Sequence, residues 1–98
     1  MNKDHVLTEL RGCLPEIRAH GVRALYLFGS TAQGVARDDS DVDIFIGPER
    51  ADRFSAFDLI DVKSILEKRL DAHVDLTTRD GLHPRLREQI EREAVQVF

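Results

Sequence analysis

Residues 22–30 read Val-Arg-Ala-Leu-Tyr-Leu-Phe-Gly-Ser, and after ten further residues the segment 41–46 reads Asp-Val-Asp-Ile-Phe-Ile. Runs of β-branched, aromatic and aliphatic residues of this length are typical of strands, so both segments are predicted to be strands. The first is apolar through most of its length, which predicts burial on both faces. A Gly-Ser pair ends the first strand and Gly47-Pro48 ends the second, as expected of residues that favour turns.

An amphipathic helix is predicted before the first strand, because apolar residues recur there at helical spacing. These residues are Val6, Leu7, Leu10, Leu14 and Ile17. Gly12 and Pro15 are expected to kink this helix or divide it in two, since neither suits a helix interior. Gly21 is expected to end it. Residues 30–36 are expected to form about two turns of helix, with Ser30 near the N-terminus.

The second half of the chain predicts two helices and a short strand. Residues 54–70 form the longest helical pattern, with a buried stripe of Leu59, Val62, Leu66 and Leu70. Residues 73–77 predict a strand, and a final helix is expected from Pro84 to about Ala94. The alternating residues 95–98 predict a short strand or contact with a partner. Strands interleaved with helices predict an α/β sandwich, with a small mixed sheet, as a single domain over residues 1–98.

The composition of the 98 residues is that of a globular protein, with 42% hydrophobic and 33% charged residues. The net charge of −4 argues against direct nucleic-acid binding, which favours a basic surface. Eleven of the 14 basic residues are arginine, which suits a phosphate site or a charged interface; a genome that prefers arginine codons gives the same bias. A lone cysteine, Cys13, fits a reducing compartment. No apolar run is long enough to span a membrane and no signal peptide is evident, so a cytoplasmic protein without a membrane partner is expected.

Asp41 and Asp43 are the sharpest indication of chemistry. On a strand, residues two apart point to the same face, which brings the two carboxylates within about 6–7 Å of each other. Such a pair repels unless a cation lies between them, and carboxylate oxygens favour a hard ion such as Mg²⁺. Asp75 lies in the third predicted strand, so three carboxylates would converge if that strand lay beside the second. The alternative is that these aspartates simply face water on an edge strand.

Gly29-Ser30 supplies the second half of the predicted site. Glycine lets the backbone approach a ligand closely, and amides at a helix N-terminus bind phosphate, to which the Ser30 hydroxyl can add a hydrogen bond. A calcium-binding loop over residues 39–50 is a competing interpretation. It fails because the EF-hand pattern needs glycine and glutamate where this chain has Ile44 and Arg50.

Gly29-Ser30, ten residues, then Asp41-Val42-Asp43 resembles the signature of the polymerase β-like nucleotidyltransferases. The flanking residues make the chain similar to the minimal nucleotidyltransferase (MNT) proteins of prokaryotes, and the similarity extends through Val74-Asp75-Leu76 to the segment 84–87. The resemblance implies the polymerase β-like nucleotidyltransferase fold.

The same resemblance implies a site and a reaction. Asp41, Asp43 and Asp75 would be catalytic residues and ligands of two Mg²⁺ ions, while Gly29 and Ser30 would bind the triphosphate of ATP. In the two-metal scheme, Asp41 and Asp43 hold ions that clamp the α-phosphate and the leaving pyrophosphate. Asp75 binds the ion that lowers the pKa of the acceptor hydroxyl, and can itself accept the proton.

Members of the resembled family are commonly encoded beside a HEPN-domain ribonuclease, with which they form a toxin–antitoxin pair. The resemblance therefore implies an antitoxin that transfers AMP from ATP to a tyrosine hydroxyl of a HEPN partner. Two alternatives remain open. The chain could neutralise the toxin by binding and occlusion without catalysis, or it could modify a small molecule of the aminoglycoside type. The intact motif favours catalysis, and the lack of a further helical domain disfavours the small molecule.

Several arginines are candidates for secondary site residues. Arg37 could contact phosphate, although a solvated loop arginine is the simpler interpretation. Arg79, Arg85 and Arg87 follow the third aspartate, so they could line the acceptor side or a partner interface. On an amphipathic helix, however, such charges usually form only the solvent-exposed face.

Overall fold

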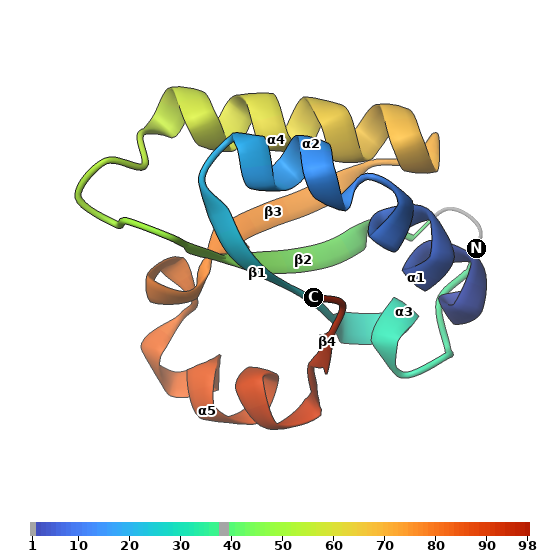
Figure 1. The fold of residues 1–98 in the computed structure, drawn as a ribbon. Helices are drawn as coiled ribbons and strands as arrows, with labels where there is room; N and C mark the ends of the chain where they lie inside the picture. Colours follow the sequence, from blue (N-terminus) through green and yellow to red (C-terminus); the bar gives the residue numbers. More distant parts are fainter. Residues whose placement is uncertain (1, 38–39) are drawn as a thin grey trace.

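The computed structural model describes residues 2–37 and 40–98, and a four-stranded mixed sheet lies at its centre (Figure 1). The strands are β1 (Val22–Phe28), β2 (Val42–Pro48), β3 (Val74–Thr78) and β4 (Val95–Gln96), in the order β3-β2-β1-β4. β1 is antiparallel to β2 and to β4, whereas β2 and β3 are parallel. The predicted mixed sheet is confirmed, and residues 95–96 do form the short strand that their alternation indicated.

Three helices cover one face of the sheet: α1 (Lys3–Gly12), α2 (Leu14–Ala19) and α4 (Ala56–Leu70). The helix before β1 is divided in two, as expected, and the break lies at Cys13, directly after Gly12. Together with one side of the strands, the helices bury an apolar core that includes Val6, Leu10, Ile17, Leu25, Leu27, Val42, Ile44, Ile46, Val62 and Leu66. This face therefore provides the hydrophobic stabilisation of the fold. None of the helices in residues 2–37 and 40–98 has the length and apolar character needed to span a bilayer.

α4 is fixed at its N-terminus and through one side chain near its C-terminal end. Ser55 caps the helix: its hydroxyl accepts a hydrogen bond from the Asp58 amide at 3.3 Å, and the Asp58 carboxylate accepts one from the Ser55 amide at 2.9 Å. This cap explains why the helix begins at Ala56 rather than at residue 54. Arg69 pairs with Glu9 of α1, with 2.8 Å between Nε and Oε2, and thereby ties the two helices together.

The other face of the sheet is covered more lightly, by the 3₁₀ turn η1 (Arg79–Gly81) and by α5 (Pro84–Glu93) (Figure 1). No residue within α5 is buried. The prediction that β1 is buried on both faces is therefore only partly correct. Leu25 and Leu27 are fully buried against the helices, whereas Tyr26 and Phe28 on the opposite face are half-buried.

Two local predictions differ from the structure. The helix α3 spans only Gly29–Ala32, not about two turns over residues 30–36, because Gly34 adopts a φ of 76° and turns the chain away. The Val35 amide then donates to the Ser30 carbonyl at 3.0 Å, which closes this turn. Strand β2 begins at Val42, so Asp41 lies one residue before it.

Candidate functional site

Asp43 and Asp75 lie side by side on the lightly covered face of the sheet. They are register partners on the parallel strands β2 and β3, whose backbones are separated by about 4.8 Å. Val42 and Ile44, which flank Asp43, are buried in the core, so the Asp43 side chain points to the opposite face. The expectation that the third strand lies beside the second is confirmed.

Asp41 contributes its charge from just outside the sheet. Its side chain is exposed, while Asp43 is half-buried. Burial raises the pKa of the Asp43 carboxyl, and the negative charges of Asp75 and then of Asp41 raise it further. A carboxylate with two like charges beside it is unfavourable when ionised, and a cation at this position would lower its pKa.

The oxygen atoms of the three carboxylates suit a hard cation, although the carboxylates are not positioned to coordinate one ion together. In residues 2–37 and 40–98, no group of three His, Cys, Asp or Glu side chains is arranged to hold an ion. The fit therefore rests on chemistry: carboxylate oxygens are the ligands that Mg²⁺ favours, and a cation would offset the burial and the negative charges of Asp75 and Asp41 that raise the pKa of Asp43. The assignment of Asp41, Asp43 and Asp75 as metal ligands remains a prediction.

Gly29 lies directly against Asp43. β1 ends at Phe28, the register partner of Asp43, and Gly29 follows with a φ of 72°, a conformation that favours glycine. A Cβ atom at Gly29 would also overlap the Asp43 carboxylate. Two independent constraints therefore require glycine at this position. The next residue, Ser30, is half-buried in the short helix α3. The two halves of the motif, ten residues apart in sequence, are brought together as expected.

The stacking of Arg79 over the rings of Tyr26 and Phe45 was not predicted from the sequence, although Arg79 itself was a candidate site residue. Tyr26 stacks on Phe45, with 4.6 Å between ring centroids, and the Arg79 guanidinium lies 4.9 Å from the centroid of the Tyr26 ring. The Arg79 Nε atom is buried and forms an ion pair with Glu91, with 3.2 Å between Nε and Oε1. The geometry of this contact does not meet the criteria for a hydrogen bond. The alternation of Tyr26 with the core leucines of β1 is the signal that could have placed its ring on this face.

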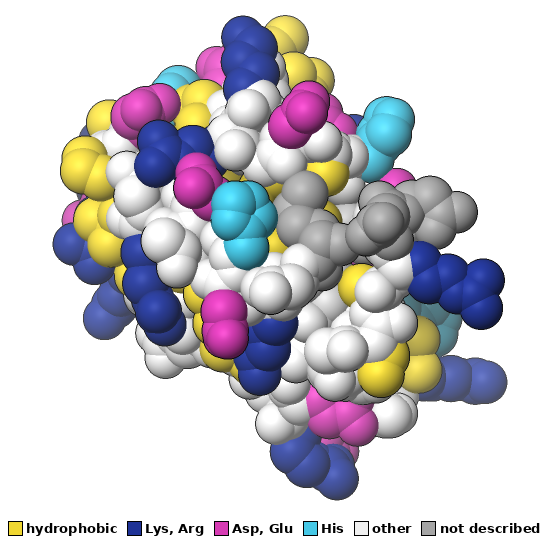
Figure 2. All heavy atoms as spheres, turned by 90° about the vertical axis from the view of Figure 1, so that its right-hand side faces the viewer, with side chains coloured by type: hydrophobic (Ala, Val, Ile, Leu, Met, Phe, Trp, Pro, Cys, Tyr) yellow, Lys and Arg dark blue, Asp and Glu magenta, His cyan; other side chains and the backbone are white. Residues whose placement is uncertain are grey.

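The other three candidate arginines, Arg37, Arg85 and Arg87, are in contact with solvent. Arg87 on α5 pairs with Glu91 at 3.2 Å and with Asp80 at 3.5 Å, while Arg85 is exposed. Arg37 is exposed too, and its amide donates to the Ser40 hydroxyl at 3.0 Å. On the side of the molecule where α1 and α3 lie, basic and acidic side chains are interspersed (Figure 2).

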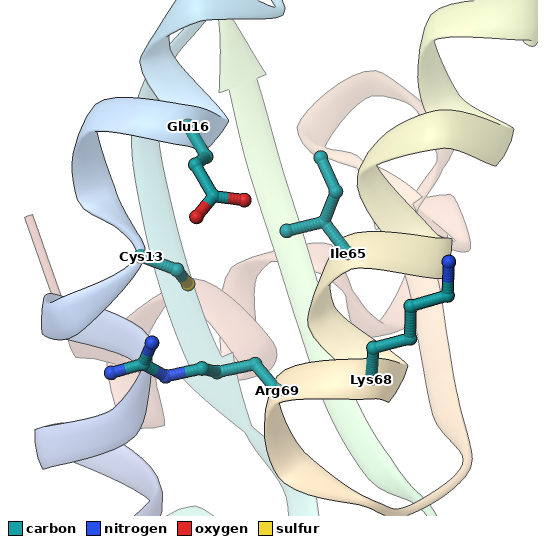
Figure 3. Close-up of a pocket in the computed structure, with 5 residues that line it drawn as sticks. All are labelled: Cys13, Glu16, Ile65, Lys68 and Arg69. Carbon is teal, nitrogen blue, oxygen red and sulfur yellow. The ribbon is translucent and has the colours of Figure 1, made fainter.

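A hollow between α2 and α4 lies on the other face of the sheet (Figure 3). Its lining residues are Cys13, Glu16, Ile65, Lys68 and Arg69. The Cys13 thiol donates to the Leu10 carbonyl at 3.2 Å, and burial raises the pKa of this thiol. A thiol that remains protonated is a poor nucleophile, and Cys13 belongs to the apolar core.

A Gly-Ser turn pressed against an aspartate, on a mixed sheet with a second aspartate in register, defines the class as a nucleotidyltransferase. Residues 15–98 match the family model described as Polymerase beta, Nucleotidyltransferase. The chain therefore belongs to the polymerase β nucleotidyltransferase family.

Two relatives are similar along most of their length. One, from Methanocaldococcus jannaschii and provisionally named protein adenylyltransferase MJ0435, is 37% identical over 90% of this chain and 92% of its own. The other, the protein adenylyltransferase MntA of Thermococcus cleftensis, is 36% identical over 79% of this chain and 76% of its own. These similarities agree with the family assignment.

Solved structures show the same fold. One, described provisionally as a minimal nucleotidyltransferase, has a TM-score of 0.83 and 36% identity over 97% of this chain and 95% of its own. A toxin–antitoxin structure with AMP-PNP has a TM-score of 0.69 and 26% identity over 100% of this chain and 73% of its own. The expected polymerase β-like nucleotidyltransferase fold and the membership of the MNT group are thus confirmed.

Proposed function

We propose that this chain transfers AMP from ATP to a protein hydroxyl and acts as the antitoxin of a toxin–antitoxin pair. The contact between Gly29 and Asp43, with Asp75 in register, carries the proposal, because it joins a phosphate-binding turn to a pair of carboxylates. Two relatives named as protein adenylyltransferases and a toxin–antitoxin structure of the same fold support it.

The five motif residues have separate roles in this proposal. The backbone at Gly29 and the hydroxyl of Ser30 bind the triphosphate, and Asp41, Asp43 and Asp75 hold two Mg²⁺ ions. When bound, these ions supply positive charge against the triphosphate and the acceptor oxygen. Asp75, on the strand farther from the Gly-Ser turn, faces the acceptor and takes the proton from its hydroxyl.

The reaction is a single displacement. A bond forms between the acceptor oxygen and the α-phosphorus of ATP, and the bond from that phosphorus to the bridging oxygen breaks, so pyrophosphate leaves. The protein contributes position and charge, with no covalent enzyme intermediate. The acceptor is a tyrosine hydroxyl of a HEPN-domain ribonuclease in a hetero-oligomeric complex in the cytoplasm, as the family resemblance implies.

Intact-protein mass spectrometry tests the proposal. The proposed HEPN-domain partner is incubated with the chain, ATP and Mg²⁺. An Asp41→Asn/Asp43→Asn double variant serves as the control. We expect a mass gain of one or more AMP groups that the double variant cannot produce. If the toxin were silenced equally by both versions without any mass gain, the alternative of neutralisation by binding alone would replace the proposal.

A further inference from the structure

Two large apolar side chains project from α4 into solvent. Phe57 is 79% exposed and Ile60 is 62% exposed. Because they are three residues apart, they lie on neighbouring turns of one face of the helix. α4 packs on the sheet through its opposite face, where Val62 and Leu66 are buried. Single exposed apolar residues are ordinary, whereas an aromatic and an aliphatic side chain side by side on one helix are typical of an interface.

The hollow between α2 and α4 opens farther along the same helix. It has a volume of about 360 Å³, and Ile65, Lys68 and Arg69 of α4 line one side of it (Figure 3). This volume lies in the range of roughly 300–1,000 Å³ that holds a bound molecule, so it can receive an aromatic ring. Phe57 precedes Ile65 by eight residues, which corresponds to about 12 Å along a helix. The chain therefore cannot fill its own hollow with its own Phe57.

The exposed charges of α4 change sign along the helix. Asp61, one turn after Phe57, is exposed, and so is Lys68, two turns farther on. Figure 3 shows the Lys68 side chain extending along α4 toward the level of Ile65. If a second copy of α4 lay antiparallel, with each Phe57 level with the other hollow, each Asp61 would face Lys68 of the other copy. A parallel pair would place identical charges together, and its helix dipoles would also repel.

The location of this surface favours a second copy over a protein substrate. α4 covers one face of the sheet, whereas the Asp43 side chain points to the opposite face. A protein bound to α4 would therefore not place an acceptor hydroxyl beside the aspartates. Two copies joined through α4 would leave the aspartates of both copies accessible.

We propose that the protein forms a two-fold symmetric homodimer through antiparallel α4 helices. Phe57 of each copy inserts into the hollow of the other copy, and Asp61 of each copy pairs with Lys68 of the other. A two-fold axis uses the same surface on both copies, so the two insertions form together. This inference goes beyond the proposed function and does not depend on it.

Sedimentation equilibrium of the full chain tests the inference. Over concentrations from about 1 to 500 µM, we expect the mass to rise from that of one chain, 11.1 kDa, toward twice this value. Phe57→Ser should raise the dissociation constant of the dimer about a hundredfold, because the contact that it removes occurs twice. Circular dichroism checks that the variant is folded. Val35→Ser is the matched control, because Val35 is 67% exposed but lies outside α4, and it should leave the dimer unchanged.

An exchange of charges tests the antiparallel arrangement. Asp61→Lys and Lys68→Asp should each weaken the dimer about tenfold, and the double variant should recover most of the loss, because the opposite charges again face each other. A double variant as weak as both losses combined would contradict the pairing.

Two results would overturn the inference as a whole. One is a wild-type chain that stays monomeric across the concentration range. If Phe57→Ser then also lost binding to the proposed partner protein, the surface would belong to that partner. The other is a Phe57→Ser variant that dimerises as tightly as the wild type. Neither result bears on AMP transfer, so failure of this inference is distinguishable from failure of the proposed function.

Discussion

Asp43 and Asp75 are register partners on the two parallel strands of the sheet, so their carboxylates occupy adjacent positions on the same face. Parallel neighbours need a crossover connection, which α4 provides between β2 and β3. The packing of this helix against the core therefore aligns two acidic residues that are 32 positions apart in the sequence.

Asparagine in place of either Asp41 or Asp43 should abolish AMP transfer. Asp41→Asn and Asp43→Asn each remove a negative charge that would hold a metal ion, and a bound metal supplies several kcal/mol of transition-state stabilisation. A loss of about a thousandfold or more in transfer rate is expected, measured with radiolabelled ATP. Asp61→Asn, at an exposed position on α4, is the control and should retain the wild-type rate. Near wild-type activity in either site variant would contradict the assignment.

The charge of Asp43 should make the metal-free protein less stable as the pH rises. The pKa of Asp43 is raised in the folded state, first by burial and then by Asp75 and Asp41, so the folded state holds this proton more tightly than the unfolded chain does. The resulting cost is absent below the pKa of the unfolded chain and complete above the folded pKa. In EDTA at neutral pH, Asp43→Asn should therefore have the higher melting temperature.

The same comparison at lower pH checks the sign of this effect. As the pH falls through the folded pKa of Asp43, the advantage of Asp43→Asn should shrink, and below the pKa of the unfolded chain it should reach its minimum. Calorimetric scans across this range would measure it. An advantage that grew on acidification would show that Asp43 is stabilised, not destabilised, in its ionised form.

Gly29→Ala should destabilise the fold more than Gly34→Ala does. Both glycines have a φ above +70°, which costs an alanine about 1–2 kcal/mol. Only at Gly29 would the added Cβ also overlap the Asp43 carboxylate, whereas nothing lies within 4 Å of it at Gly34. An additional loss of about 1 kcal/mol or more is expected for Gly29→Ala, measured by urea denaturation. Equal losses would mean that Asp43 moves aside without cost.

Arg79→Ala should loosen α5. The Arg79 side chain lies over the Tyr26 ring and pairs with Glu91 of α5, so it joins this helix to the sheet. A partly exposed cation–π contact contributes about 0.5–1 kcal/mol, and its loss should speed amide hydrogen exchange within α5. Arg92→Ala is the control, because the Arg92–Glu88 pair is solvent-exposed and contributes little. Unchanged exchange in Arg79→Ala would show that other contacts hold the helix.

The strands and most helix ends could be predicted from the sequence because their signals are local. Apolar runs fixed β1 and β2, Gly12 marked the division of the first helix, and Pro84 marked the start of α5. The length of α3 was overestimated, since the positive φ of Gly34 depends on the turn that the chain makes after this helix.

Only those site residues that belong to a recognisable sequence motif could be predicted. Gly29 and Asp43 were paired because their spacing resembles a known signature, but their direct contact follows from the register of β1 on β2. The placement of Arg79 over Tyr26 joins residues far apart in the sequence, and no local pattern encodes it.

The pairing of β4 with β1 has a consequence for how the protein folds. Leu25, in the middle of β1, accepts a hydrogen bond from the Val97 amide at 2.8 Å and donates one to the Phe98 carbonyl at 3.1 Å. During synthesis, β1 therefore cannot acquire its second neighbour until residues more than 70 positions later have left the ribosome. Such long-range pairing slows folding and leaves an unpaired strand edge exposed in the growing chain. This edge is where a nascent molecule would be most open to aggregation or to capture by a chaperone.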